Sequence, residues 1–433
     1  MLEKISPNLR KIIGNTTWLF GEKILQLFLG LFVGVWVARY LGPERFGLYN
    51  YVVAIVLLFS VVAKLGLEQI IVRDISRDIS QKDKTLGTGC ILRFVASLLA
   101  TIGVIIFALI SEPNDPNILL FVGIFAIGNS FSRSMEVIDY WFQSQVQSKY
   151  VVVAKNIVYI IINVAKIIAI QLQAPLLVFI VILSIEQVLT AIGLAVVYQF
   201  SGSLIKAWRF SRDRALSLLQ DSWPLILANI VTVIYMRIDQ VMLAQMVSTE
   251  SVGIYSAAVK ISEMWYFVPI SIINSVYPSV VQGKELGDRI YYGRIQKLLS
   301  IVTIIGYLAA IPITFLSPYI VNLIYGVQYA EAANILTIHI WAGLFIGLGV
   351  ARTTWLTTEN LTQFAAATTA LGAVINIILN TLWIDTYGGT GAAVATVISQ
   401  IVASYLSGLF FKPIRPIFWR QTKALFLMGL WEK

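Results

Sequence analysis

The chain alternates between long apolar runs and short polar connections. Each run holds about 20 or more mostly apolar residues, the length that an α-helix needs to cross the hydrocarbon core of a bilayer. The runs therefore predict twelve membrane-spanning helices. The first six are 12–38, 47–66, 87–110, 117–141, 150–170 and 175–199, and the second six are 220–246, 252–281, 296–316, 332–356, 361–383 and 388–411.

Composition supports this fold class, an all-α polytopic membrane protein. Of the 433 residues, 58% are hydrophobic and only 13% are charged, which is too few charges for a soluble globular protein. A membrane β-barrel is excluded because its strands would alternate apolar and polar residues, whereas these runs are continuous. Since there is only one cysteine, Cys90, and one histidine, His339, we expect neither a disulfide framework nor a metal site.

The lysines and arginines predict the orientation. Connections on one side of the membrane carry 22 of the 32 cationic residues, whereas the opposite side carries only Arg39 and Arg45. Because cytoplasmic loops are enriched in lysine and arginine, both termini are expected in the cytoplasm. This sorting signal explains most of the net charge of +9, so no nucleic-acid partner is expected. The run 12–38 is too long for a cleavable signal peptide and is interpreted as a span.

One stretch near the start of the chain recurs in its second half. Residues 40–55 align without a gap on residues 246–261, an offset of 206 positions, with five identical residues in sixteen. The identical pairs include Glu44 with Glu250, Gly47 with Gly253 and Tyr49 with Tyr255. Both copies follow an apolar run near the start of a half-chain, which favours an internal duplication.

The duplication predicts the domain organisation. Six spans per half is an even number, so both halves enter the membrane in the same direction and are related by a pseudo-twofold axis along the membrane normal. We expect two six-helix lobes around a central cleft. The predicted boundaries are 1–199 for the first lobe, 200–219 for a cytoplasmic linker, 220–411 for the second lobe and 412–433 for a cytoplasmic or interfacial amphipathic tail.

Cations inside the spans are candidates for substrate binding. A charge deep in a bilayer costs about 3 kcal/mol or more, so it needs a partner or a water-filled cavity. Arg93, Lys155 and Arg352 lie near cytoplasmic ends, where their side chains are expected to reach the interface. The deeper cations are expected to line a hydrated cavity that binds an anionic solute, with Lys260 as a further deep cation; the candidate substrate-binding residues are Lys23, Arg133, Lys166 and Arg237.

Acids inside the spans allow two interpretations. Glu136 lies three residues after Arg133, and Glu263 three after Lys260, so each pair can be neutralised on one helix. An acid on another helix, such as Glu186 or Asp221, can likewise give a cation a structural role. Alternatively, a buried carboxylate binds a proton or a sodium ion that drives transport; the candidates are Asp239, Glu186 and Glu263.

Several short motifs occur along nearly the whole chain. The first half contains ARYLGPERFGLY at 38–49, Gly66-Leu67-Glu68 and Arg73-Asp74. The second half contains Arg237-Ile238-Asp239-Gln240, Gly253-Ile254-Tyr255 and the segment 318–336. Together these motifs resemble those of Wzx-type oligosaccharide flippases, in the polysaccharide transporter family of the MOP superfamily.

This resemblance implies a function and its partners. It implies that the protein moves an undecaprenyl-pyrophosphate-linked oligosaccharide across the bacterial inner membrane by alternating access, for O-antigen or exopolysaccharide synthesis. The implied partners are the lipid-linked oligosaccharide, membrane lipids and assembly proteins such as a polysaccharide polymerase. The protein would be no enzyme and would need no cofactor, which agrees with the lack of a nucleotide-binding loop or a nucleophile with its base.

Three other functions stay open at this point. A MATE-like exporter of cationic drugs should have an acidic interior, which the deep cations argue against. A lipid II flippase usually has fourteen spans, whereas twelve are predicted here. A membrane glycosyltransferase or polymerase should carry a long extracytoplasmic loop with carboxylates or histidines, and the longest loop here has about fifteen residues.

Overall fold

The computed structural model describes residues 7–428, with side chains from Gly14 onward. The two ends of the chain, which are predicted to be cytoplasmic, lie outside the described residues. Every long element in the described part is a helix. In chain order these are α1 (Pro7–Lys64), α2 (Leu67–Arg77), α3 (Lys82–Ser111), α4 (Pro116–Met135), α5 (Val137–Ser144), α6 (Lys149–Gln171), α7 (Leu176–Phe200) and α8 (Arg212–Met246); then α9 (Thr249–Met264), α10 (Phe267–Glu285), α11 (Asp288–Tyr325), α12 (Ala332–His339), α13 (Ala342–Thr358), α14 (Thr362–Ile401), α15 (Ser407–Phe410) and α16 (Arg415–Leu425).

Ten helical stretches in the described part are long and apolar enough to cross a membrane. The first, Gly14–Arg77, has 64 residues and the last, Thr362–Phe410, has 49, each more than twice the roughly 20 residues of one crossing. Both are interrupted by a glycine in the left-handed region, Gly42 with φ 72° and Gly388 with φ 53°. Counting each as two spans gives twelve, as predicted from the apolar runs.

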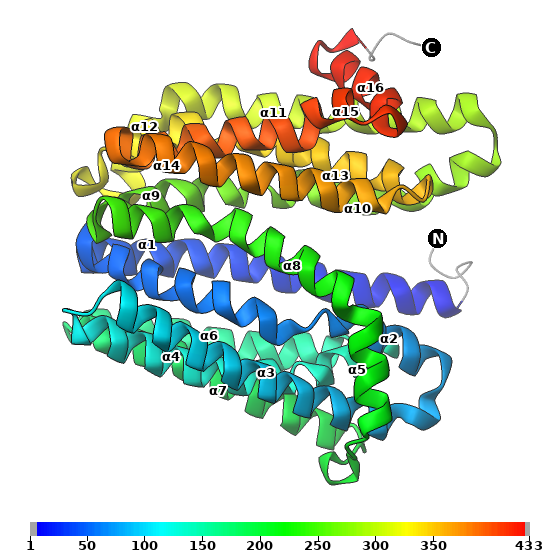
Figure 1. Ribbon diagram of the computed structural model, residues 1–433, viewed down its shortest axis with the longest axis horizontal. Helices are drawn as coiled ribbons and strands as arrows, with labels where there is room; N and C mark the ends of the chain where they lie inside the picture. The colour runs from blue at the N-terminus through cyan, green and yellow to red at the C-terminus, as the bar shows by residue number, and fades with distance from the viewer. Residues whose placement is uncertain (1–6, 429–433) are drawn as a thin grey trace. The chain divides into compact units, whose positions relative to one another are not determined.

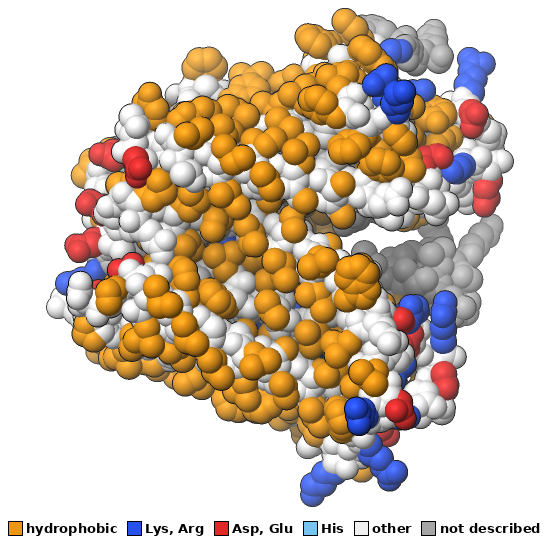
Figure 2. Space-filling model, in the orientation of Figure 1, with side chains coloured by type: hydrophobic (Ala, Val, Ile, Leu, Met, Phe, Trp, Pro, Cys, Tyr) orange, Lys and Arg blue, Asp and Glu red, His pale blue; other side chains and the backbone are white. Residues whose placement is uncertain are grey.

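The surface is that of a membrane protein. Figure 2 shows hydrophobic side chains along the lengths of the helices and charged side chains towards their ends. Many large apolar side chains are exposed, among them Phe28, Leu99 and Phe315. Apolar surface of this extent needs a lipid environment, which agrees with the composition.

The chain divides into two compact units. Among the described residues, the first comprises 7–41 and 51–233, and the second comprises 42–50 and 234–428. The division therefore lies inside α8, whereas the sequence analysis expects it at the linker 200–219. The linker belongs to the first unit because its backbone packs on α3: a Cβ on Gly87 would lie 2.7 Å from the amide nitrogen of Arg209.

Each unit has its own helical core. In the first unit α4 packs against both α3 and α7, and α7 also packs against α6 (Figure 1). In the second unit α11 packs against α10, α12 and α13. One face of α16 is buried in this second core through residues such as Ile417 and Ala424, while Trp419 is exposed. The tail segment thus contains a helix that packs on the protein through one face, and its interfacial position stays a prediction.

The two echoed stretches pack directly against each other within the second unit. A Cβ on Gly47 would lie 1.6 Å from the carbonyl oxygen of Thr249. A Cβ on Gly253 would lie 2.0 Å from the carbonyl oxygen of Pro43. Thr249 and Gly253 lie 206 positions after Pro43 and Gly47, so each copy makes the same contact with the other. A local twofold axis produces such a pair of equivalent contacts. The reciprocity supports the register of the duplication, and superposition of the complete halves stays a prediction.

This contact predicts a specific intolerance to side chains. Gly47→Ala and Gly253→Ala are each expected to destabilise the protein by about 1–3 kcal/mol, because a methyl group would meet backbone atoms. Gly123→Ala in α4 is the control, since no atom lies within 4 Å of the Cβ position. Thermal unfolding in detergent measures the effect. If all three variants unfold at the wild-type temperature, the close backbone contact does not exist.

Candidate functional site

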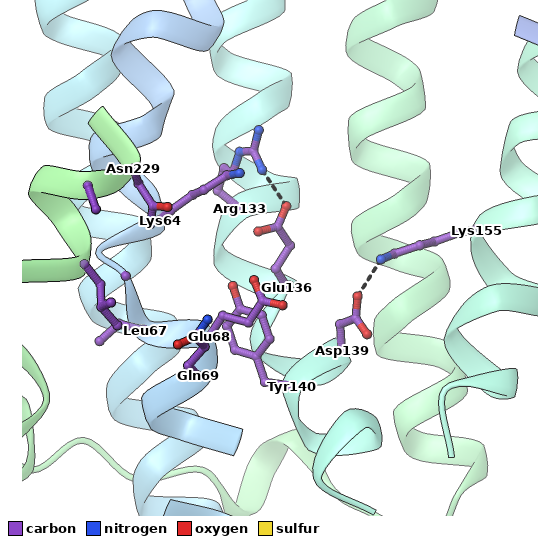
Figure 3. Close-up of a pocket in the computed structure, with 13 residues that line it drawn as sticks. Lys64, Leu67, Glu68, Gln69, Arg133, Glu136, Asp139, Tyr140, Lys155 and Asn229 are labelled. Carbon is purple, nitrogen blue, oxygen red and sulfur yellow. Dashed lines mark hydrogen bonds and ion pairs between the residues drawn. The ribbon is translucent and has the colours of Figure 1, made fainter. Parts of the chain in front are cut away.

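A cavity of about 320 Å³ lies in the first unit, where α1 ends and where α4 breaks into α5. We call it the charged pocket. Figure 3 shows charged side chains from α1, α2, α4, α5 and α6 around it. Its lining residues are Lys64, Gly66, Leu67, Glu68, Gln69, Arg133, Glu136, Asp139, Tyr140, Lys155, Leu225, Ala228 and Asn229.

A turn between α1 and α2 builds one wall of the charged pocket. Leu65 and Gly66 have φ values of 50° and 58°, so the chain reverses there after Lys64. A Cβ on Gly66 would lie 2.7 Å from Cβ of Leu225, so α8 packs on the turn at a point where only glycine fits. The turn therefore brings Lys64 and Glu68 to the cavity together with Asn229 of α8.

Arg93 does not line the charged pocket, but it contacts four residues that do. Its side chain has no exposed surface and forms an ion pair with Glu136. Its remaining N–H groups donate to the carbonyl oxygens of Arg133 (2.6 Å) and Lys64 (3.2 Å) and to the hydroxyl of Tyr140 (2.5 Å). The expectation that Arg93 reaches the interface is wrong, because these groups satisfy the guanidinium inside the unit.

Two further ion pairs line the charged pocket (Figure 3). Arg133 Nη1 lies 2.7 Å from Glu136 Oε1, which confirms the pairing that the spacing of three residues predicts. Lys155 Nζ on α6 lies 2.5 Å from Asp139 Oδ2 on α5. Lys155 is therefore held by an acid on another helix and is not extended to the interface as expected.

Two charged side chains of the charged pocket have no ion-pair partner among the described residues. Lys64 and Glu68 form no ion pair within 4 Å in the described part of the chain. Lys64 is half-buried, so its ammonium group is only partly hydrated. The amides of Gln69 and Asn229 add hydrogen-bond donors and acceptors to the same cavity. Lys64 can bind an anion, while Glu68, Gln69 and Asn229 can bind neighbouring hydroxyl groups.

A second polar site lies in the second unit around Asp239. This carboxylate is 5% exposed and accepts hydrogen bonds from three neutral groups. The donors are the Tyr255 hydroxyl (2.7 Å), the Asn380 amide (2.7 Å) and the Thr396 hydroxyl (2.8 Å). Asn376 bonds both to Asn380 and to Thr396. We call Asp239, Tyr255, Asn376, Asn380 and Thr396 the Asp239 cluster.

The Asp239 cluster has the chemistry of a site for a small monovalent cation. Its oxygen atoms come from one carboxylate, two amides and two hydroxyls, and Oδ1 of Asn380 is buried without a hydrogen-bond partner. This oxygen can still accept a hydrogen bond or contact a cation. The described residues contain no group of three or more His, Cys, Asp or Glu that could hold a metal ion. With its single carboxylate, the cluster can neutralise one positive charge, such as that of a proton or a sodium ion.

The other predicted residues lie outside these two sites. Lys166 pairs with Glu186 at 3.6 Å between α6 and α7, which is the structural role left open for both. Lys23 is exposed on α1. In the second unit, Glu263 interacts electrostatically with Arg237 and Lys260. Of the four cations predicted to bind substrate, only Arg133 lines the charged pocket, and the binding roles of the others stay predictions.

Sequence reasoning missed several members of both sites. Lys64 is one of the 22 cations that the sequence analysis assigns to connections, although it ends α1 at the cavity wall. Asn376 and Asn380 stand four residues apart inside an apolar run, a spacing that places both on one helix face. Two asparagines with this spacing inside an apolar run are a sequence signal for a buried polar site.

Comparison with known proteins identifies the family of this chain. The model of the polysaccharide biosynthesis protein family matches residues 12–284, more than half of the chain. The chain belongs to this family. The MatE family model matches residues 224–382, in the second half. The family resemblance that the motifs indicate is thereby confirmed.

Relatives of this polysaccharide biosynthesis protein agree with that assignment. "Probable flippase AglR" of Haloferax volcanii is 24% identical over 415 residues, covering 90% of this chain and 81% of that protein. Among solved structures, the lipid II flippase MurJ in an inward closed conformation gives a TM-score of 0.75 at 17% identity, with 97% of this chain and 93% of MurJ covered. An inward-facing multidrug resistance MATE transporter of the MOP superfamily gives 0.65 at 14% identity, covering 94% and 96%. The chain thus shares the fold of these two transporters.

Proposed function

We propose that this family member is a flippase that moves a lipid-linked oligosaccharide across the membrane by alternating access. The observation that carries the proposal is the charged pocket, a polar cavity built among helices whose outer surfaces are apolar. A lipid-linked glycan has the same division, since its headgroup is anionic and hydroxylated while its tail is apolar. The relative named as a flippase supports the same function.

The anionic headgroup is proposed to bind in the charged pocket. Lys64 is the cation there that is not already paired with a carboxylate, so it is the first contact for a phosphate or an acidic sugar. Arg133 keeps its predicted role because one of its guanidinium nitrogens, Nε, is buried without a hydrogen-bond partner. Gln69 and Asn229 would bind sugar hydroxyls.

The Asp239 cluster is proposed to couple transport to a sodium ion or a proton. Asp239 is one of the three carboxylates expected in this role, and its donors are all neutral. Among the other two, Glu186 is paired with Lys166, and Glu263 interacts with Arg237 and Lys260. A carboxylate that no cation neutralises is best suited to take up and release an ion.

We also propose the lipid carrier, the membrane, the orientation of the chain and its partners. The carrier would be undecaprenyl pyrophosphate, the membrane the bacterial inner membrane, and the termini cytoplasmic. A polysaccharide polymerase and other assembly proteins would use the delivered glycan. The protein would make and break no covalent bond, because a catalytic constellation is lacking from its sequence.

Reconstitution tests the proposed function. Purified protein in liposomes should move a fluorescently labelled lipid-linked oligosaccharide between leaflets, and the mass of the lipid should stay unchanged. A membrane glycosyltransferase would change that mass. Export of a cationic dye without movement of the labelled lipid would support a drug exporter and contradict the flippase.

Removing the positive charge of Lys64 should weaken binding of the substrate in the charged pocket. Lys64→Gln is expected to raise the substrate concentration for half-maximal flipping by about 10-fold, because a charge-assisted hydrogen bond contributes about 1.5–3 kcal/mol. Lys149→Gln is the control, since Lys149 is an exposed lysine of the same unit that does not line this cavity. The assay measures initial rates against substrate concentration. Equal values for the two variants would remove Lys64 from the site.

A further inference from the structure

The last helix, α16, is fastened to the second unit by one fully buried amide. Gln421 has no exposed surface, and its Nε2 donates to the carbonyl oxygens of Leu348 (3.2 Å) and Ser404 (3.0 Å). Leu348 lies in α13, and Ser404 lies in the turn Val402–Leu406 that follows α14. A single side chain of α16 thus bridges two neighbouring elements.

The turn Val402–Leu406 is a π-helical turn, which holds one more residue than an α-helical turn. The amide of Ser407 donates to the carbonyl oxygen of Val402, five residues back. The carbonyl oxygen of Ala403, its partner in an α-helix, accepts instead from Arg352 Nη2 at 2.8 Å. Arg352 is 4% exposed, so the expectation that it reaches the interface is wrong. Arg352 and Gln421 therefore bind two successive carbonyl groups of the π turn.

The π turn is continuous with the Asp239 cluster. Thr396, which donates to Asp239, precedes the turn by six residues on the same helix. The methyl group of Ala403 lies 2.6 Å from where Gly372 would carry a Cβ, so the turn packs on the first part of α14. That part also carries Asn376 and Asn380. The register of the turn therefore affects how Thr396 faces the two asparagines.

A change of register would move Thr396. Converting the π turn to an α turn removes one residue from it, which rotates the helix on one side by about 100° relative to the other. The bonds from Arg352 and Gln421 to Ala403 and Ser404 are formed in the π register. They stabilise that register over the α alternative.

We propose that Gln421 is a positioning residue: by binding the Ser404 carbonyl it holds the π register that places Thr396 in the Asp239 cluster. This rests on the coupling role given to the cluster under the proposed function. Packing alone does not require glutamine here, since its Oε1 is buried without a partner and an apolar residue would avoid that cost. Helix α16 thereby tunes the affinity of the cluster for its cation.

The experiment compares two buried glutamines that both fasten α16. Gln421→Leu removes the bond to the π turn. The control, Gln296→Leu, removes a bond of the same kind from Gln296 Nε2 to the Arg420 carbonyl oxygen (3.2 Å), and Gln296 is also buried. Both variants are reconstituted, and flipping is measured against sodium at fixed pH and against pH without sodium. Gln421→Met is the second variant if Gln421→Leu does not accumulate.

Gln421→Leu should change the half-saturating cation concentration by about 10-fold, within the range of coupling between sites, and keep the maximal rate. Gln296→Leu should leave that concentration unchanged while losing similar thermal stability. Equal shifts in both variants, or no shift in Gln421→Leu, would overturn the inference. If wild-type flipping responds to neither sodium nor pH, the coupling role of the Asp239 cluster fails first, which distinguishes that outcome from failure of the inference.

Discussion

Glu136→Ala is expected to prevent the protein from accumulating in the membrane. Glu136 pairs with both Arg93 and Arg133, and Arg93 has no exposed surface. Without the carboxylate, the Arg93 charge would stay buried and unpaired, which typically costs about 3–5 kcal/mol. That loss is a large fraction of the stability of a folded domain. Expression level and thermal unfolding in detergent measure it.

Glu68→Gln is the matched control for this prediction. Glu68 lines the same cavity, but it is exposed and forms no ion pair within 4 Å in the described residues. This variant should accumulate and unfold like the wild type. Normal stability of Glu136→Ala would mean that the Arg93–Glu136–Arg133 network does not support the fold of the first unit.

Asp239→Asn is expected to abolish the cation dependence of flipping. The carboxylate supplies the only negative charge of the Asp239 cluster, so the amide would leave neutral oxygens to hold a cation. At a cation concentration that half-saturates the wild type, the rate should fall by about 100-fold, because an interaction with a charged group contributes up to about 3 kcal/mol. The protein should still accumulate, because asparagine has the same shape and accepts hydrogen bonds.

Glu263→Gln separates this prediction from a general effect of losing a buried acid. Glu263 is another predicted coupling residue in the same unit, near Arg237 and Lys260. Its variant should keep the cation response. If Glu263→Gln loses the response and Asp239→Asn keeps it, the coupling site has been assigned to the wrong carboxylate.

The sequence was sufficient to predict the helices and the register of the duplication. Apolar runs of membrane length depend only on local composition, so the twelve spans match the structure to within a few residues over most of their ends. The echo also pairs Gly47 with Gly253, which make reciprocal contacts in the structure. Sequence periodicity does not fix where a span breaks, as the break of α4 at Glu136 shows.

The charged site could be predicted only in part, because ion pairs between helices depend on tertiary packing. The pair of Arg133 with Glu136 follows from their spacing on one chain segment. The pairs of Lys155 with Asp139 and of Lys166 with Glu186 join different helices. The position of a residue along its helix likewise did not predict its exposure. Arg93 and Arg352 both lie near a span end, but neighbouring helices bury them.

Substrate protection of single cysteines shows whether the charged pocket binds the headgroup of a lipid-linked oligosaccharide. Cys90 is the only cysteine, so Cys90→Ser gives a background in which single cysteines can be labelled. Gln69→Cys and Asn229→Cys place the label on the pocket wall, and Ser76→Cys places it on an exposed part of α2 away from the pocket. If the headgroup binds there, added lipid-linked oligosaccharide slows labelling at positions 69 and 229 and leaves position 76 unchanged. Unchanged labelling at 69 and 229, under conditions where flipping proceeds, would show that the headgroup binds elsewhere.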